Sequence, residues 1–253
     1  MILAVDMGNT HIVLGVLDGE KILCNERIAT DHKKTSAEYE VLIDTILRMR
    51  GIDDSQIEGA IVSSVVPPLT HDICEAIKKA VGKTPLVIGT KIKTGLNIRI
   101  DDPKTLGADL LVGSVAAMEL YGYPAIVIDM GTATTLMVVD ENRNFIGGAV
   151  APGVKISLNA LSSGTSALPA IDLEAPKKVV STNTVECMQS GVIYGQAAML
   201  DGMIERMKEE LGYDCKVIAT GGLSKLIVPY CKNEIIYDND LMLKGLKLIY
   251  EKN

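Results

Sequence analysis

The sequence contains no tryptophan and a single phenylalanine, Phe145, and aromatic residues make up only 4% of it. A platform for stacking nucleic-acid bases is hard to build from so few rings, and the core has to consist of Ile, Leu, Val, Ala and Met. A formal net charge of −7 opposes attraction to a phosphate backbone, and no dense run of Lys and Arg interrupts it. We therefore expect no nucleic-acid partner.

Histidine and cysteine are sparse, and none of them is spaced like a zinc ligand. A dedicated zinc site is therefore not expected. The cysteines are odd in number and scattered, which favours reduced thiols in a cytoplasmic protein over a disulfide framework. These residues are His11, His32, His71, Cys24, Cys74, Cys187, Cys215 and Cys231.

Long apolar runs are also missing, although 47% of the residues are hydrophobic. No run approaches the roughly 18 residues of a membrane-spanning helix. The first residues predict a strand that reaches Asp6 with no basic segment before it, so we expect neither a membrane partner nor a secretory signal.

What the sequence does contain is one pattern used twice, in residues 5–10 and 128–134. Each copy is an apolar strand that ends in Asp-Met-Gly, followed by small polar residues and a second apolar run. Glycine allows a sharp turn because it accepts positive φ and has no Cβ to obstruct a ligand. The turn N–H groups can then bind phosphate oxygens while the carboxylate holds a cation. A single copy would suit an ordinary hairpin turn, but the repetition favours two related domains that bind one nucleotide between them.

The remaining pattern predicts a mixed α/β chain with an antiparallel meander at the start of each half. Thr35 and Glu38 have the spacing of a capping box, and Gly51 ends the helix that follows. The apolar run 60–66 predicts a buried parallel strand. Residues 91–104 are expected to form a loop over a site. Further helices are expected over 69–81, 105–121 with its apolar residues on one side, 184–211 and 241–251, with Gly191, Gly195 and Gly202 marking close packing in the third.

A third candidate motif for the functional site is Gly107-Ala108-Asp109, at the start of an expected helix. A carboxylate in a first helical turn can simply favour the positive end of the helix dipole. Beside two phosphate hairpins, it could instead accept the proton of an attacking hydroxyl.

These motifs together resemble the type III pantothenate kinases of the actin/Hsp70/sugar-kinase superfamily. Further agreement comes from residues 63–67, 147–153 and 183–191. The resemblance spans the chain and implies an α/β fold of two ribonuclease-H-like domains, residues 1–122 and 123–253, with an interdomain cleft. It implies ATP-dependent phosphorylation of pantothenate, the first step of coenzyme A biosynthesis, by a homodimer.

The resemblance also implies roles for particular residues. Asp109 would be the general base, Asp129 would bind K⁺ or NH₄⁺, and Mg²⁺ would arrive with ATP. The substrate would contact Gly107, Ala108, Asp109, Leu110 and Thr184. ATP would contact Asp6, Met7, Gly8, Asn9, Thr10, His11, Ile12, Val13 and Thr132, with Gly221-Gly222 either beneath adenosine or an ordinary turn.

Two positions depart from the family pattern, and both lie on the acceptor side. Leu110 stands where the family usually has Arg, and Ile100 stands where many relatives have Tyr. Leucine cannot replace the five donors of a guanidinium group. Two alternatives therefore stay open: a non-catalytic nucleotide-binding regulator related to the Bvg accessory factor, and a kinase for another small hydroxylated acceptor.

Overall fold

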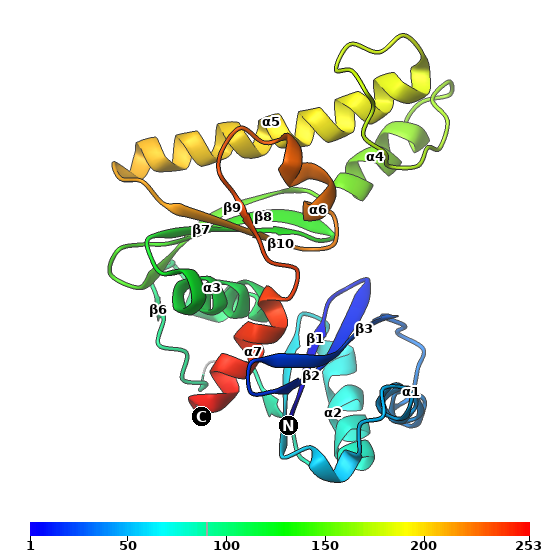
Figure 1. Ribbon diagram of the computed structural model, residues 1–253, viewed down its shortest axis with the longest axis vertical. Coiled ribbons are helices and arrows are strands. Elements are labelled where there is room, and N and C mark those ends of the chain that lie inside the picture. Colours follow the sequence, from blue (N-terminus) through cyan, green and yellow to red (C-terminus); the bar gives the residue numbers. More distant parts are fainter. Residues whose placement is uncertain (90) are drawn as a thin grey trace. The chain divides into compact units, whose positions relative to one another are not determined.

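The structure is a computed structural model that describes residues 1–89 and 91–253. The chain forms two compact units (Figure 1). Unit 1 comprises Met1–Gly95, Asp101–Ala116 and Leu241–Asn253, and unit 2 comprises Leu96–Ile100 and Ala117–Asp240. The C-terminal helix thus belongs with the first unit, and the division falls within the helix that carries Asp109. A domain boundary at residues 122 and 123 stays a prediction.

Unit 1 contains a mixed sheet with the strand order β3-β2-β1-β4-β5. The first three strands form the expected antiparallel meander, and β4 and β5 continue the sheet in parallel with β1. The buried strand predicted at 60–66 is confirmed as β4. The strands are β1 (Ile2–Met7), β2 (His11–Asp18), β3 (Lys21–Ala29), β4 (Gly59–Ser64) and β5 (Leu86–Val87).

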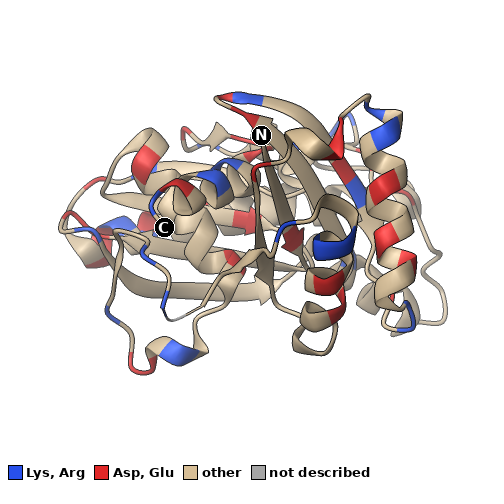
Figure 2. Cartoon of the chain, turned by 90° about the horizontal axis from the view of Figure 1, so that it is seen from below, with Lys and Arg blue, Asp and Glu red and all other residues tan. Residues whose placement is uncertain are grey.

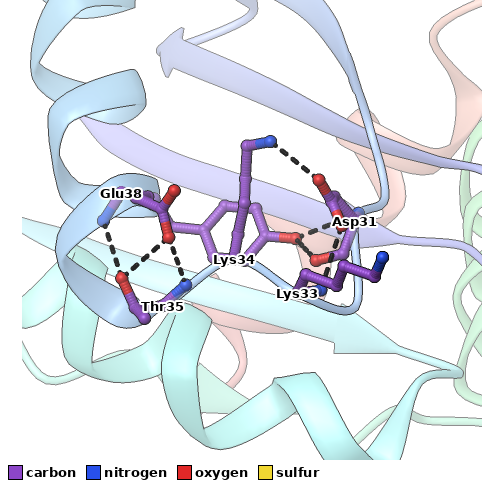
Figure 3. Close-up of polar contacts among 6 residues, drawn as sticks. Asp31, Lys33, Lys34, Thr35 and Glu38 are labelled. Carbon is purple, nitrogen blue, oxygen red and sulfur yellow. Dashed lines mark hydrogen bonds and ion pairs between the residues drawn. The ribbon is translucent and has the colours of Figure 1, made fainter.

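Two helices, α1 (Ser36–Met49) and α2 (Pro67–Val81), cover one face of this sheet. The predicted capping box of α1 is confirmed: the Glu38 N–H donates to Thr35 Oγ1, and Glu38 Oε2 accepts from the Thr35 N–H at 2.8 Å (Figure 3). Helix α2 starts at Pro67, two residues before the expected start, because proline fits the first helical turn, where no N–H donor is needed.

The C-terminal helix α7 (Leu241–Glu251) matches its predicted bounds and packs against β1 and β4. Two strand glycines make room for it. A Cβ on Gly15 would lie 2.6 Å from Leu243 Cδ1, and a Cβ on Gly59 would overlap the Tyr250 hydroxyl. The unit 1 sheet is therefore covered on both faces, by segments from opposite ends of the chain.

Unit 2 repeats the same strand order. Its sheet reads β9-β8-β7-β10-β11 from one side, which corresponds to β3-β2-β1-β4-β5, with β6 added beside β9. The second meander is confirmed, whereas β6 lies in the segment expected to be only a loop. A two-residue strand carries too little periodicity to be read from sequence. The strands are β6 (Asn97–Ile98), β7 (Ala125–Met130), β8 (Ala133–Val139), β9 (Asn144–Pro152), β10 (Lys216–Thr220) and β11 (Ile236–Tyr237).

Helices α4 (Val154–Ser163), α5 (Thr184–Leu211) and the short α6 (Ser224–Ile227) pack on one face of this second sheet. The predicted bounds of α5 are confirmed, but close packing at its glycines is wrong. A Cβ on Gly191 or Gly195 would meet nothing within 4 Å, and one on Gly202 would meet only the end of the Arg206 side chain.

Helix α3 (Ala108–Tyr121) follows a short 3₁₀ turn at Pro103–Thr105, so it begins three residues later than expected. The expected apolar side is also wrong, because residues 111–118 are buried around the whole helix. Its small residues Gly113, Ser114, Ala116 and Ala117 permit this burial.

The described helices lack the length and apolarity needed to cross a membrane. Acidic and basic residues are intermixed on the helices and loops (Figure 2).

Candidate functional site

The first Asp-x-Gly motif forms the turn between β1 and β2. The Gly8 N–H donates to the His11 carbonyl oxygen at 2.9 Å and closes a three-residue loop. The explanation by positive φ is wrong here, since Gly8 is not among the glycines with positive φ. What glycine provides is space, because a Cβ would lie only 3.2 Å from the His11 oxygen. The side chains of Asn9 and Thr10 are exposed at the tip.

Strand alternation decides which side chains of this motif are accessible. Val5 and Met7 are buried in the core with α1 and α2, so Asp6 lies on the opposite face of the sheet, where it is partly exposed. Ile12 is also fully buried. Any contact of Met7 or Ile12 with a nucleotide is therefore limited to backbone atoms, whereas Asp6, Asn9, Thr10 and His11 can offer side chains.

The second motif forms the turn between β7 and β8 in the same way. The Gly131 N–H donates to the Ala133 carbonyl oxygen at 3.0 Å and closes a loop shorter by one residue. Gly131 likewise lacks a positive φ. Asp129 lies on the sheet face opposite the core residues Ile128 and Met130, as Asp6 does in unit 1. The repeated sequence pattern therefore corresponds to a repeated structure.

Two further glycines lie directly against this second hairpin. A Cβ on Gly153 would lie 2.1 Å from the Thr132 carbonyl oxygen. Gly221, which has φ +93°, lies beside Asp129: a Cβ there would be 2.4 Å from Asp129 Oδ1 and 2.7 Å from the Met130 nitrogen. The sequence left Gly221 either beneath adenosine or in an ordinary turn, and only the pairing of β10 with β7 reveals that it lies beside Asp129.

Asp109 lies in the first turn of α3 with its carboxyl group folded back on the helix start. Its Oδ1 accepts the Leu110 N–H at 2.8 Å, and a Cβ on Gly107 would come within 2.6 Å of the same oxygen. Burial raises the pKa of the Asp109 carboxyl above its ordinary value, and the hydrogen bond from Leu110 offsets this only in part. A carboxylate whose pKa is raised by burial is better suited to accept a proton than one at its ordinary value.

Thr184 begins α5, but the helix cap is the preceding residue, because Asn183 Oδ1 accepts the Glu186 N–H at 2.9 Å. The exposed Thr184 side chain is left to line a pocket of about 810 Å³ within unit 2. The pocket is lined by residues of α4, of the segment before α5 and of the first turns of α5: Ser157, Leu161, Leu168, Ser181, Thr182, Asn183, Thr184, Cys187, Met188, Gly191, Val192 and Gln196.

The structure thus gathers the proposed groups in two sets. Unit 1 holds residues 6–13 together with Gly107, Ala108, Asp109 and Leu110, while unit 2 holds Asp129, Thr132 and Thr184. In the described part of the chain, no three His, Cys, Asp or Glu side chains are grouped as a metal cage would require. Single carboxylates such as those of Asp6 and Asp129 fit hard cations that take one protein carboxylate each. Magnesium commonly binds in this way, completing its shell with phosphate and water oxygens.

The family model for type III pantothenate kinases matches residues 2–206. The type III pantothenate kinase of Halalkalibacterium halodurans is 47% identical, and that of Moorella thermoacetica 44% identical, each over the full length of both chains. A solved structure described as a conserved Baf family transcriptional activator from Campylobacter jejuni has a TM-score of 0.61 at 19% identity, with 99% of this chain and 98% of that chain covered. The two units share one sheet topology, the arrangement expected of two ribonuclease-H-like domains. The chain belongs to the type III pantothenate kinases, the ATP-dependent kinases that phosphorylate pantothenate in the first step of coenzyme A biosynthesis.

Proposed function

We propose that this chain phosphorylates pantothenate with Asp109 as the general base and that each Asp-x-Gly hairpin contributes contacts to ATP. The observation that carries the proposal is the Asp109 carboxyl, whose pKa burial raises, in a family member that retains both hairpins. Asp109 lies in a helical first turn that Gly107 opens for it.

In the proposed reaction, an oxygen of Asp109 accepts the proton of the pantothenate hydroxyl as that hydroxyl attacks the γ-phosphorus. The bond between the γ-phosphorus and the bridging oxygen breaks, and ADP leaves with that oxygen. Such a transfer depends on alignment and charge neutralisation more than on covalent chemistry by the protein. The turn N–H groups and the hydroxyls of Thr10 and Thr132 supply donors for the phosphates. Bound Mg²⁺ would neutralise phosphate charge, with Asp6 as its protein carboxylate.

For the monovalent cation we propose Asp129 as the ligand of K⁺ or NH₄⁺. Its support is local: the carboxylate is partly exposed, and Gly131 and Gly221 lie close to its Oδ1 atom. Large monovalent cations need several oxygen donors. A carboxylate held against turning backbone can provide them together.

We also propose a homodimer in the cytoplasm. Support comes from exposed apolar side chains on α4, on the segment leading into α5 and on the first turn of α5, a surface of the kind that protein partners cover. Val179→Asp should shift the mass measured by light scattering toward a monomer. Val41→Asp, on α1 and equally exposed at 63%, should not. The exposed residues are Ile156, Leu161, Val179, Val180 and Val185.

A coupled assay of ADP release tests the catalytic proposal. We expect ADP release that requires pantothenate, is faster in potassium than in sodium, and is lost in Asp109→Asn. Asp54→Asn removes an exposed carboxylate that, like Asp109, accepts the N–H of the next residue; it is the matched control and should keep full activity. ATP binding without pantothenate-dependent turnover would favour the regulatory alternative, which the departure at Leu110 keeps open. Turnover with another hydroxylated acceptor would favour the other alternative, a kinase for a different small substrate.

A further inference from the structure

The connector between β3 and α1 holds the first hairpin at both ends of its turn. Thr30 Oγ1 donates to the Gly8 carbonyl oxygen at 2.6 Å, and the Thr30 N–H donates to the Thr10 carbonyl oxygen at 3.0 Å. Gly8 and Thr10 are the first and last residues of the three-residue loop. One residue outside the motif therefore fixes the position of both ends of the loop.

These bonds also orient a donor. In a trans peptide the carbonyl and the following N–H point in opposite directions. Since the Gly8 carbonyl points toward Thr30, the N–H of Asn9 points away from the connector. An N–H at the tip of a phosphate hairpin is the kind of group expected to donate to a phosphate oxygen. Releasing the Gly8 carbonyl would allow this peptide to rotate.

The connector is itself anchored to the core of unit 1. The fully buried Tyr39 donates its hydroxyl to the Asp31 carbonyl at 3.0 Å and accepts the Asp31 N–H at 3.3 Å. Asp31 is also paired with Lys34 at 3.0 Å (Figure 3). The capping box at Thr35 fixes the other end of the connector. Thr30 is thus fixed by a chain of hydrogen bonds that begins in α1.

We propose that Thr30 is a positioning residue for ATP, acting through the Gly8 carbonyl and the orientation of the Asn9 N–H. The inference rests on the proposed ATP site at the first hairpin. Its energetic consequence follows from the hydroxyl bond alone, because the Thr30 N–H remains in any variant. Without that bond the Gly8 peptide has to be oriented when ATP binds, and the net contribution of one such hydrogen bond limits this cost to about a three- to tenfold change in affinity.

The test is the dissociation constant of Mg-ATP, measured by calorimetry on full-length variants. Thr30→Val keeps the shape and removes the hydroxyl, so we expect affinity to fall about three- to tenfold, with KM for pantothenate within a factor of two. Thr30→Ser should bind ATP like the wild type. The matched control is Thr45→Val: Thr45 Oγ1 also donates to a backbone carbonyl oxygen, that of Val41 at 2.7 Å, but on the outer surface of α1. It should leave ATP affinity unchanged.

A second variant guards against a folding defect. Tyr39→Phe removes the anchor of the connector without emptying the core, and it should weaken ATP binding in the same direction. Thermal melts of the ligand-free proteins show whether each variant is folded. An unchanged ATP affinity in folded Thr30→Val, or an equal loss in Thr45→Val, would overturn the inference. Asp6→Asn separates this from the proposed function: if Asp6→Asn weakens ATP binding and Thr30→Val does not, only the role of Thr30 fails. If Asp6→Asn also has no effect, the ATP site itself is misplaced.

Discussion

Gly221→Ala should damage the second hairpin far more than an ordinary glycine substitution would. Gly221 has φ +93°, and a Cβ there would lie 2.4 Å from Asp129 Oδ1 and 2.7 Å from both the nitrogen and the carbonyl carbon of Met130. Two of these three atoms belong to the backbone of β7 and cannot turn aside. The methyl group must therefore displace either the Asp129 carboxylate or the turn after β10.

The structure provides a matched control for the strain that a positive φ alone imposes on alanine. Gly212, at the end of α5, has φ +75°, and a Cβ on it would meet nothing within 4 Å. Gly212→Ala should cost only the strain of a left-handed alanine, about 1–2 kcal/mol. Gly221→Ala adds an overpacking cost of about 1–3 kcal/mol. The free energy of unfolding should therefore fall by about 2–5 kcal/mol in Gly221→Ala.

Two assays on both variants check this reasoning. Denaturant unfolding should give the larger loss for Gly221→Ala, and the ratio of turnover in potassium to turnover in sodium should approach one in that variant alone. Equal stability losses would show that the contact with Met130 is relieved without cost. A retained potassium preference in a folded Gly221→Ala protein would show that the methyl group leaves a cation-binding Asp129 carboxylate in place and moves the turn after β10 instead.

Three other variants test separate parts of the argument. Asp109→Asn should lower kcat by about 10²–10⁴-fold, and the acid limb of the wild-type pH profile should lie above the ordinary pKa of Asp, because burial raises the pKa of Asp109. A folded-state pKa that is raised means that the charged carboxylate disfavours folding, so Asp109→Asn should also raise the Tm at neutral pH; a lowered Tm would contradict this. Leu110→Arg should lower KM for pantothenate by about tenfold or more while KM for ATP stays within about a factor of three, unless residue 110 does not face the acceptor. Gly195→Ala should stabilise the protein by about 1 kcal/mol in thermal melts because its Cβ enters open space; destabilisation would reveal a partner packed on α5.

Local signals in the sequence were sufficient for much of the fold. The capping box at Thr35 and Glu38 predicted the start of α1, and the bounds of α5 and α7 followed from periodicity and flanking residues. Short-range rules suffice for such elements because a helix satisfies its hydrogen bonds within one segment. They failed at β6, whose two residues are held only by a distant strand.

The repeated Asp-x-Gly pattern likewise predicted two hairpins and the sheet duplication around them. The prediction that Gly8 and Gly131 adopt a positive φ was wrong, because φ depends on the loop length and on the carbonyl oxygen that each glycine N–H meets. The glycines within the predicted helix 184–211 were also misread, because close packing was expected at Gly191 and Gly195, where the structure has open space.

By itself, the sequence determined the family, the class of chemistry and the identity of the hairpins, because these depend on residue types at short spacing. Only the tertiary structure decided that Thr30 holds the first hairpin, that Gly221 lies against Asp129, and that burial raises the pKa of Asp109. Each of these depends on segments that are distant in the sequence or on the total burial of a group. Such quantities are properties of packing, which no local pattern contains.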